Sequence, residues 1–426
     1  MSGISAPRGT RDILPGEVEK WQYMEDVVRR VCARYGYREI RTPLFEHTEL
    51  FQRGIGEATD IVEKEMYTFT DRGGRSITLR PEGTAPVVRA YLEHKLYGSA
   101  PPVRLFYHGP MFRYERPQAG RYRQFHQFGI EALGSQDPLM DTETILVALT
   151  IFEEMGLEGL HTEINSMGCP RCRPMYREGL KQYLKGRLKR LCPVCQTRYE
   201  QNPVRILDCK EDRCREELEE VPEIGDYLCP ECRDHFELVQ RYLTSLGRPY
   251  SLNPRLVRGL DYYTKTVFEV IAPGMGAQSA VAGGGRYDGL AEECGGRATP
   301  AVGFAAGMDR LLLALESQGK ELSLSRELDA FVAIVGDKAR MMALKVAVAL
   351  RDHGFRVEME TEGRSLRAQL KTADRLGAAH VIIIGEEELG RNAVVIRNME
   401  DGGQQEVPLA QLIESPESVS LQKISG

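Results

Sequence analysis

Residues 104–131 constrain the fold of this chain more than any other stretch, because two alternating segments flank a loop rich in arginine. Apolar side chains alternate through the first segment, and from residue 121 to residue 131 successive side chains again fall on opposite faces. Pro117 and Gly120, which lie between the segments, are typical turn residues. The pattern predicts two antiparallel strands joined by a loop.

The predicted loop carries four charged residues, which are Arg113, Glu115, Arg116 and Arg121. Arginine, rather than lysine, favours two-pronged contacts to phosphate. On the second strand Gln127 and Glu131 fall on one face, because side chains alternate along a strand. A carboxylate and an amide beside fixed arginines suit a small ligand that bears both an amine and a phosphate. A charged surface hairpin is the alternative interpretation.

The bulk properties of the chain exclude several classes of protein. A length of 426 residues can hold two or three domains. The N-terminal residues lack an apolar signal core and no apolar run approaches membrane-spanning length, so we expect a cytoplasmic protein with no membrane partner. The net charge of −6 means that any contact with nucleic acid must come from local basic patches.

The N-terminal part predicts a helix, a strand and a hairpin in succession. Residues 17–35 form the helix, with an apolar face, and residues 37–45 the strand, which contains Pro43. Proline removes a donor from the ladder of hydrogen bonds, so this strand suits an edge or an interface. Residues 66–79 predict the hairpin.

Residues 79–84 lead into a predicted helix that runs to about residue 97. Glu82 and Thr84 lie in its first turn, where both residue types commonly cap helices. Pro81 and Gly83 fix a backbone that capping alone would not need. The pattern therefore favours ligand binding over capping.

Residues 165–250 predict a helical insertion with an uneven charge distribution. Between residues 171 and 190 there are eight lysines or arginines and a single acid, Glu178, whereas acids dominate over 211–237. The insertion also holds eight cysteines in pairs, which are Cys169 and Cys172, Cys192 and Cys195, Cys229 and Cys232, and a looser pair of Cys209 and Cys214.

The spacing from the first cysteine pair to the second suits a zinc site. In a large chain without a secretion signal, clustered cysteines are more often reduced thiols or metal ligands than disulfides. A helical context between the pairs is unusual for a zinc ribbon. A plain helical insertion with reduced thiols therefore stays open beside a structural zinc site, and we assign no residue as a metal ligand.

Arg258 lies beside Gly259 in an apolar context and shortly precedes Tyr262 and Tyr263. An exposed pair of strands could explain the tyrosines, but it does not explain the arginine. The position of Arg258 therefore indicates a binding site.

Two further segments point to ligand contact. Residues 281–290 contain a glycine run without the Gly-Lys-Ser/Thr of a Walker loop, so we expect its glycines to let the backbone approach a ligand closely. Residues 302–313 predict a strand that runs into an apolar helix, with Arg310 at the start of the helix. A surface helix residue is the ordinary alternative for Arg310.

Beyond a polar boundary over 317–327, strands and helices alternate, which is typical of a small α/β domain. One predicted helix there, over 365–376, carries a basic stripe on one face. The basic residues of this face are Arg364, just before the helix, and Arg367, Lys371 and Arg375.

These segments together resemble the histidyl-tRNA synthetase family of class II aminoacyl-tRNA synthetases. Residues 112–127 resemble motif 2, and the segments over 256–264 and 281–290 resemble the two histidine-specific signatures. Residues 17–45 are similar to motif 1, which forms the dimer interface in the family, and residues 302–310 resemble motif 3. All five segments stand in the order of the family.

The resemblance implies an α+β fold. We expect a class II catalytic domain with an antiparallel sheet over residues 1–325, interrupted by the helical, cysteine-rich insertion over about 169–250. An α/β anticodon-binding domain over residues 328–426 would follow. The implied protein is a homodimer that activates L-histidine with ATP and Mg²⁺ to histidyl-adenylate, releases pyrophosphate, transfers histidine to the 3′ end of tRNA(His) and releases AMP.

The resemblance also implies residue roles. Arg258 and Arg113 would be catalytic, and Arg113, Glu115 and Arg310 would bind ATP. The loop residues Arg116, Gln118 and Arg121 would meet tRNA. Histidine would be bound by seven residues: Glu82, Gly83, Thr84, Gln127, Glu131, Tyr262 and Tyr263. Within this set Glu82, Thr84 and Gln127 would hold the α-ammonium group, whereas Glu131 and Tyr263 would bond the imidazole.

Two alternatives come from other functional classes. A synthetase-like regulatory subunit of ATP-phosphoribosyltransferase shares the fold, but it generally lacks the C-terminal domain and loses the catalytic arginines. This chain keeps Arg113, Arg258 and Arg310 and has the additional domain. A plain tRNA-binding module would not need the pocket formed by Glu82, Gln127 and Glu131.

Overall fold

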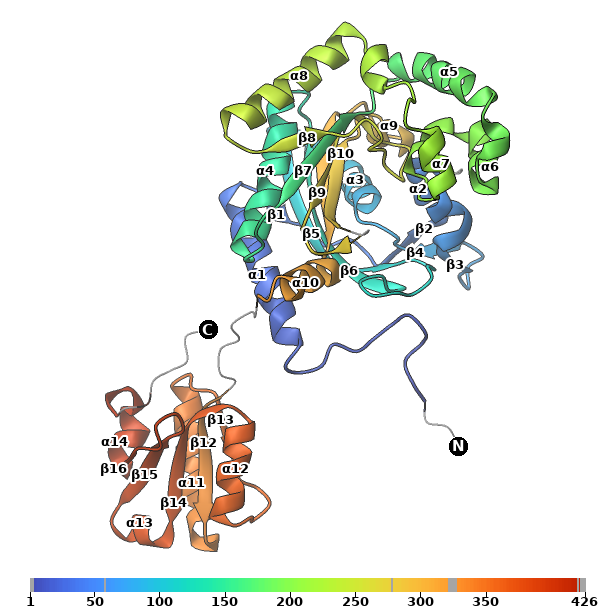
Figure 1. Ribbon diagram of the computed structural model, residues 1–426. Helices are drawn as coiled ribbons and strands as arrows, with labels where there is room; N and C mark the ends of the chain where they lie inside the picture. Colours follow the sequence, from blue (N-terminus) through green and yellow to red (C-terminus); the bar gives the residue numbers. More distant parts are fainter. Residues whose placement is uncertain (1–3, 57–58, 277–278, 321–327, 420, 422–426) are drawn as a thin grey trace. The chain divides into compact units, whose positions relative to one another are not determined.

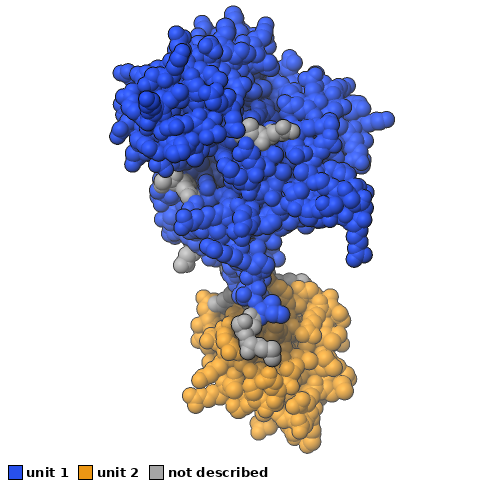
Figure 2. Space-filling model, turned by 90° about the vertical axis from the view of Figure 1, so that its right-hand side faces the viewer, with its two compact units in different colours: residues 1–321 blue, residues 322–426 orange. Residues whose placement is uncertain are grey.

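The structure is a computed structural model that describes residues 4–56, 59–276, 279–320, 328–419 and 421. The chain divides into two compact units, residues 1–321 and residues 322–426, which are coloured separately in Figure 2. Among the described residues, no helix is both long enough and apolar enough to cross a membrane.

The first unit is built on an eight-stranded sheet (Figure 1). Neighbouring strands run antiparallel except for β1 with β5 and β7 with β8, which are parallel. The strand order across the sheet is β1 (Arg38–Glu39), β5 (Val103–Phe112), β6 (Gln124–Leu133), β11 (Ala301–Gly307), β10 (Ala280–Arg286), β9 (Thr264–Ile271), β7 (His161–Ser166) and β8 (Tyr250–Leu252).

The hairpin predicted within residues 104–131 is confirmed as β5 and β6. The two strands pair antiparallel with Tyr107 opposite Gly129 and Gly109 opposite Gln127. Residues 113–123 form the loop between them. Since β6 also pairs with β11, the hairpin occupies the interior of the sheet and is not a surface hairpin.

Helices pack on this sheet because each has an apolar face. The predicted N-terminal helix is α1, in which Trp21, Met24, Val27 and Val31 are buried. Asp137 caps α4 by accepting a hydrogen bond from the N–H of Leu139. The helices of this unit outside the insertion are α1 (Val18–Arg34), α2 (Thr48–Ile55), α3 (Thr84–Glu93), α4 (Pro138–Glu154), α9 (Leu290–Glu293) and α10 (Met308–Ser317), with a single π-helical turn over Ile61–Glu65 and a 3₁₀ turn over Leu96–Gly98.

A smaller sheet of three antiparallel strands has the order β2 (Phe45–His47), β4 (Ser76–Leu79) and β3 (Tyr67–Thr70). It contains the predicted hairpin over residues 66–79. The single strand predicted over residues 37–45 is wrong, because β1 belongs to the large sheet and β2 to the small one. Pro43, which lacks a donor for the ladder, lies in the segment where the chain leaves one sheet for the other.

The insertion is helical, as the sequence predicts. In Figure 1 α5, α6 and α7 gather on one side of the unit, and α8 packs along α4. His235 on α8 lies 3.2 Å from the Asp141 carboxylate on α4, a contact that ties the insertion to the sheet. The elements are α5 (Cys172–Lys185), α6 (Pro193–Gln201), α7 (Asp212–Glu217) and α8 (Pro230–Ser245), with 3₁₀ turns over Leu188–Arg190, Pro203–Asp208 and Ile224–Tyr227.

The cysteine pairs combine differently from the expectation. The sequence spacing suggested that the first pair joins the second, but Cys169 instead lies near Cys229, and Cys192 lies near Cys209. The expected combination is wrong because α5 carries the chain away from the first pair before the second pair is reached.

The second unit has a five-stranded sheet in the order β13, β12, β14, β15, β16. β12 pairs parallel with β13 and β14, and the remaining pairs are antiparallel. The sequence did not indicate β16, since Gln404, Gln405 and Glu406 are exposed on this edge strand and give no apolar alternation. The bounds are β12 (Leu328–Val335), α11 (Arg340–Asp352), β13 (Val357–Met359), α12 (Leu366–Arg375), β14 (Ala378–Gly385), α13 (Glu386–Gly390), β15 (Ala393–Asn398), β16 (Gln404–Pro408) and α14 (Leu409–Glu414), with 3₁₀ turns over Asp337–Ala339 and Pro416–Ser418.

Candidate active site

A cavity of about 290 Å³ lies against β6, β11, β10 and β9, the four central strands of the large sheet. The amino end of α3, the loop after β5, the segment before β9 and the start of α10 complete its walls. It therefore gathers segments that are far apart in the sequence. The candidate residues that line it are Glu82, Thr84, Arg113, Glu115, Arg121, Gln127, Arg258, Tyr262, Tyr263 and Arg310.

Glu82 is almost fully buried and lies at the amino end of α3. Its Oε2 accepts a hydrogen bond from the backbone N–H of Thr84 at 2.6 Å, and its Oε1 accepts one from that of Ala85 at 2.9 Å. The residue therefore caps the helix and also lines the cavity. Burial raises the pKa of Glu82, while the two backbone donors oppose the rise.

Gly83 makes room for a side chain of the protein. A Cβ atom at this position would stand 2.2 Å from Cε2 of Tyr107, a buried residue on β5. The hydroxyl of Tyr107 is buried and has no hydrogen-bond partner among the described residues. Gly83 thus holds the first turn of α3 directly against the ring of Tyr107.

Glu131 lies beneath the cavity and does not line it. Its carboxylate is fully buried, with Oε1 accepting a hydrogen bond from the hydroxyl of Thr84 at 2.7 Å and Oε2 accepting one from Tyr287. Burial raises the pKa of Glu131 to about 8, although the two hydroxyl donors oppose the rise. The Glu131 carboxyl is therefore protonated near neutral pH, because burial disfavours its charged form.

Gln127 on β6 lines the cavity with an unsatisfied acceptor. Its Oε1 is buried and has no hydrogen-bond partner among the described residues. A buried acceptor without a donor costs about 1–3 kcal/mol, so a ligand that carries an N–H group would stabilise it.

Tyr262 and Tyr263 are both buried and line the same cavity. Their ring centroids are 4.7 Å apart, and the ring of Tyr262 is 5.6 Å from that of Tyr287. Burial raises the pKa of both tyrosines, so their hydroxyls stay protonated near neutral pH.

Arg258 also lines the cavity and forms an ion pair with Glu269 on β9. Its guanidinium carbon is 5.7 Å from the centroid of the Tyr263 ring. Gly283 on β10 lines the cavity and also leaves the space that this guanidinium fills. The position of the Arg258 guanidinium therefore depends on both strands, through the ion pair with Glu269 on β9 and the space left by Gly283 on β10.

Three further guanidiniums form a basic wall, which consists of Arg113, Arg121 and Arg310. Arg113 Nε donates to the carbonyl oxygen of Pro81 at 2.8 Å, and Arg310 Nη1 donates to that of Ala280 at 2.8 Å. Burial lowers the pKa of Arg310, and the charge of Arg121 lowers it further. Repulsion within the wall would be relieved by a polyanion.

Glu115 is the acid of this wall, and its Oε2 lies 3.3 Å from Nη1 of Arg121. Arg116 and Gln118 do not line the cavity and are exposed on the loop. Gln118 and Arg121 close the tip of the loop with two backbone hydrogen bonds of 3.1 and 2.9 Å. The loop therefore presents one face to the cavity and another to solvent.

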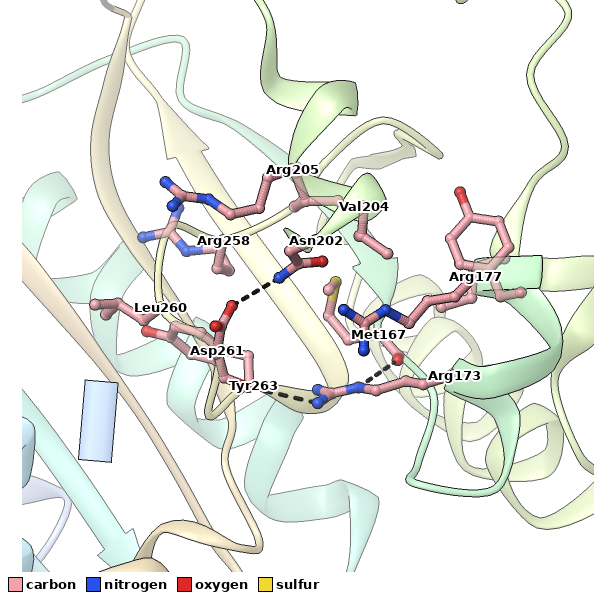
Figure 3. Close-up of a pocket in the computed structure, with 13 residues that line it drawn as sticks. Met167, Arg173, Arg177, Asn202, Val204, Arg205, Arg258, Leu260, Asp261 and Tyr263 are labelled. Carbon is pink, nitrogen blue, oxygen red and sulfur yellow. Dashed lines mark hydrogen bonds between the residues drawn. The ribbon is translucent and has the colours of Figure 1, made fainter. Parts of the chain in front are cut away.

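A second cavity of about 170 Å³ adjoins the first, because Arg258, Leu260 and Tyr263 line both. Figure 3 shows Asn202 and Arg173 of the insertion directed at Asp261, the residue before the tyrosines. Asn202 Nδ2 donates to Asp261 Oδ1 at 3.0 Å, and Arg173 Nη1 donates to the Asp261 carbonyl oxygen at 3.4 Å. The insertion is thus packed against the segment that carries the tyrosines.

Three residues of the site were missed from the sequence: Tyr107, Tyr287 and Glu269. Tyr287 lies in the glycine-rich segment, but only its contact with Glu131, 156 residues away, gives it a role. Glu269 interrupts a buried apolar strand, which is the one signal that could have revealed it. Tyr107 looks like an ordinary core residue in the sequence.

Taken together, the cavity is lined by carboxylate and amide acceptors and by four guanidiniums. A mainly antiparallel sheet whose central hairpin carries a phosphate-suited arginine loop, in a chain with a separate α/β unit, defines a class II aminoacyl-tRNA synthetase. Comparison with known proteins gives the particular family.

A family model described as histidyl-tRNA synthetase matches residues 9–171 and 208–311, and one described as an anticodon binding domain matches residues 329–415. The chain therefore belongs to the histidyl-tRNA synthetase family. The α+β fold with its antiparallel catalytic sheet and C-terminal anticodon-binding domain is confirmed.

Individual relatives agree with this assignment. A protein named histidine–tRNA ligase from Desulforamulus reducens is 57% identical over 407 residues, which cover 96% of this chain and 97% of the relative. One of the same name from Geobacillus kaustophilus is 56% identical over 409 residues, which cover 95% and 96%. The crystal structure of apo histidyl-tRNA synthetase from S. aureus matches with a TM-score of 0.83 at 41% identity, covering 97% of this chain and 99% of that one.

Proposed function

We propose that this chain is a histidine–tRNA ligase that forms histidyl-adenylate from L-histidine and ATP and then transfers histidine to the 3′ end of tRNA(His). The observation that carries the proposal is the set of polar groups that the cavity brings together. It is lined by acceptors from Glu82 and Gln127 and by guanidiniums from Arg113, Arg258 and Arg310. An amino acid joined to a nucleotide carries the matching groups, an ammonium and phosphates.

The acceptors of the cavity would bind histidine. The unsatisfied Oε1 of Gln127 and the carboxylate of Glu82 suit the α-ammonium group, and Thr84 lines the cavity with them. The Tyr263 hydroxyl and the Glu131 carboxyl would bond the imidazole. Because Glu131 is already bonded to Thr84 and Tyr287, its contact with the ligand requires a shift of the Thr84 side chain or of the carboxyl itself. Gly83 would contribute by fixing the turn.

The guanidiniums of the cavity would bind ATP. Arg113 and Arg310 suit the phosphates, because guanidinium groups match phosphate oxygens in geometry and charge. Glu115 and Glu269 line the cavity with carboxylate oxygens, the ligands that Mg²⁺ prefers, so the residues present fit this ion. When bound, Mg²⁺ would neutralise part of the negative charge of the phosphates.

The first step is attack of the histidine carboxylate on the α-phosphate, with pyrophosphate leaving in line. Arg258 lines the cavity between Tyr263 and Glu269, which it contacts, and it would bond both the carboxylate and the α-phosphate. Its ion pair with Glu269 holds the guanidinium before the reaction begins, so little reorganisation is needed. Positioning and charge stabilisation therefore account for the catalysis.

In the second step the terminal ribose hydroxyl of tRNA attacks the adenylate and releases AMP. Arg116, Gln118 and Arg121 on the loop next to the cavity would contact the end of the tRNA. In the second unit the exposed Arg367, Lys371 and Arg375 of α12 would contact the anticodon arm by neutralising phosphates.

We also infer a homodimer in the cytoplasm. The small sheet exposes Phe45 on β2 and Phe69 on β3, which are 56% and 49% exposed. Aromatic side chains left in water on the two outer strands of one sheet are typical of a contact surface between subunits. This surface adjoins the segment that resembles motif 1.

A regulatory subunit is not favoured as the alternative. A crystal structure named as an ATP phosphoribosyltransferase regulatory subunit/histidyl-tRNA synthetase from Bacillus halodurans C matches at 22% identity with a TM-score of 0.64, which shows the fold alone. The relatives above 50% identity over nearly the whole chain are named as ligases.

Histidine-dependent exchange between ATP and labelled pyrophosphate tests the proposal. We expect exchange with L-histidine and none with the other amino acids. Gln127→Ala should raise the KM for histidine, whereas Gln118→Ala, which changes a glutamine outside the cavity, should leave exchange intact and affect only tRNA charging. A folded wild-type protein without histidine-dependent exchange would disprove the ligase function.

A further inference from the structure

The eight cysteines of the insertion form two separate groups of four. The neck cluster is Cys169, Cys172, Cys229 and Cys232, and the tip cluster is Cys192, Cys195, Cys209 and Cys214. Within each cluster all four Sγ atoms lie within 4.8 Å of one another. Each cluster also combines a pair from one part of the insertion with a pair from another.

The distances fit a tetrahedral metal site. In the neck cluster the Sγ of Cys169 lies 3.6 Å from that of Cys172 and 3.9 Å from that of Cys229, and in the tip cluster Cys192 Sγ lies 3.9 Å from Cys209 Sγ. A tetrahedron with Zn–S bonds of about 2.3 Å has sulfur–sulfur edges of about 3.8 Å. All ten cysteines carry free thiols.

The backbone around the clusters favours thiolates. The N–H of Cys229 donates to Cys172 Sγ at 3.2 Å, and the N–H of Cys192 donates to Cys214 Sγ at 3.2 Å. Pro193 and Pro230 begin α6 and α8, so Cys195 and Cys232 lie in first turns. Backbone donors and the positive end of a helix both stabilise a thiolate.

The surroundings add positive charge at the neck cluster. Nη2 of Arg171 lies 4.0 Å from Cys229 Sγ, and the same nitrogen is bonded to Glu231 at 2.6 Å. Thiolates bound to a divalent ion leave a net negative charge, which a guanidinium offsets.

We propose that each cluster binds one structural Zn²⁺ through four cysteine thiolates. Both sites are closed, with four protein ligands and no position left for substrate, so their role is to hold the insertion together. The tip cluster includes Cys192 and Cys195, which lie within residues 172–207, outside the ranges matched by the family model. The proposal does not depend on the ligase function.

The neck cluster lies where it can act on the active site. It joins the beginning of α5, which follows β7, to the beginning of α8, the helix that leads the chain back to the catalytic sheet at β8. Arg173, the residue after Cys172, is the one that donates to the carbonyl oxygen of Asp261 (Figure 3). Zinc at the neck would therefore fix the insertion against the segment that carries Tyr262 and Tyr263.

The tip cluster holds a second contact. It joins α6 to the 3₁₀ turn at Pro203–Asp208 and to α7. Arg198 and Arg205 of these elements both reach Oδ2 of Asp60, at 3.0 and 2.9 Å. Each cluster therefore lies next to a contact between the insertion and the rest of the first unit.

Zinc content of the full-length protein, purified without chelator and measured by plasma mass spectrometry, tests the proposal. We expect two Zn²⁺ per chain. Cys169→Ser and Cys192→Ser should each retain one, and Cys294→Ser, a cysteine outside both clusters, should retain two. Growth on Co²⁺ should give the visible spectrum of tetrahedral thiolate-bound cobalt.

The wild-type measurement decides the matter even if a variant fails to fold. Less than a tenth of a zinc per chain, with eight insertion thiols that all react at once under native conditions, would overturn the proposal. Disulfides detected in the insertion by mass spectrometry under non-reducing conditions would overturn it as well, as would full retention of zinc in both ligand variants.

Discussion

Arg258 lies against Gly283, so closely that a Cβ atom at position 283 would stand 2.2 Å from Nη2 of the arginine. The glycine is on β10, and the arginine precedes β9. The missing side chain at position 283 leaves the space that the guanidinium occupies. The glycine-rich run over residues 281–290 therefore affects where the Arg258 guanidinium lies.

Gly283→Ala should therefore move Arg258 and slow adenylate formation. Displacement of a catalytic group by about 1 Å can cost on the order of 10²-fold in rate. We expect a loss of that order in ATP–pyrophosphate exchange with little change in stability. Gly289→Ala is the control, because nothing lies within 4 Å of a Cβ there. Equal activity of the two variants would show that Arg258 tolerates the shift.

Arg258→Ala should remove the donor itself. Loss of one preorganised donor costs on the order of 10²–10³ in rate, or roughly 3–4 kcal/mol. We expect that loss in the first step and a much smaller change in the KM for histidine. Arg258→Lys should rescue only part of the rate, because lysine keeps the charge but not the two-pronged geometry of the guanidinium. Single-turnover rates measure the first step, and transfer from preformed histidyl-adenylate should suffer less. Equal losses in both steps would make Arg258 a structural residue.

How far the sequence predicts this structure depends on the range of the interactions concerned. The hairpin of β5 and β6, the helix α1 and the hairpin of β3 and β4 follow from alternation and periodicity within a few residues. The segments that line the cavity could also be found, because charged residues interrupt apolar patterns there.

Long-range partners could not be predicted from such patterns. Glu131 looks like a residue on the face of a strand, but Thr84 and Tyr287 bury its carboxylate from two other segments. Which cysteine pairs meet in space depends on the path that the chain takes through α5, and the spacing of the cysteines along the sequence does not reveal that path. The edge strand β16 is polar and so gives no signal.

Glu131 should make the stability of the first unit depend on pH. Its pKa is about 8 in the folded protein against an ordinary value of 4.5. The folded state therefore holds a proton that the unfolded state releases, and this stabilisation is complete below about pH 4.5 and lost as the pH rises through about 8. Glu131→Gln carries no such proton. We expect the free energy of unfolding to fall more steeply in the wild type than in the variant between about pH 5 and 8.

Fluorescence of Trp21, the single tryptophan, follows this unfolding, because the residue is buried on α1 within the first unit. Denaturant titrations at a series of pH values give the free energies. Parallel curves for the two proteins would mean that Glu131 is ionised throughout this range.

Removal of residues 328–426 should separate the two steps of the reaction. Every residue that lines the cavity belongs to the first unit, and the second unit has its own apolar core. Adenylate formation should therefore remain, while tRNA charging falls by at least about tenfold, equivalent to roughly 1.4 kcal/mol of lost binding. Exchange and charging assays on the shortened protein measure the two steps. Normal charging would contradict a role for the second unit in tRNA binding.

Arg173→Ala should weaken histidine binding without releasing zinc. The guanidinium donates to the carbonyl oxygens of Asp261 and Met167, so its loss frees the segment that carries Tyr262 and Tyr263. Loss of about 1–1.5 kcal/mol would raise the KM for histidine by roughly tenfold. Arg213→Ala, on the exposed side of α7, is the matched control. If both variants keep two zinc ions and only Arg173→Ala raises KM, the insertion acts on the site through this contact; an unchanged KM in both would separate the insertion from histidine binding.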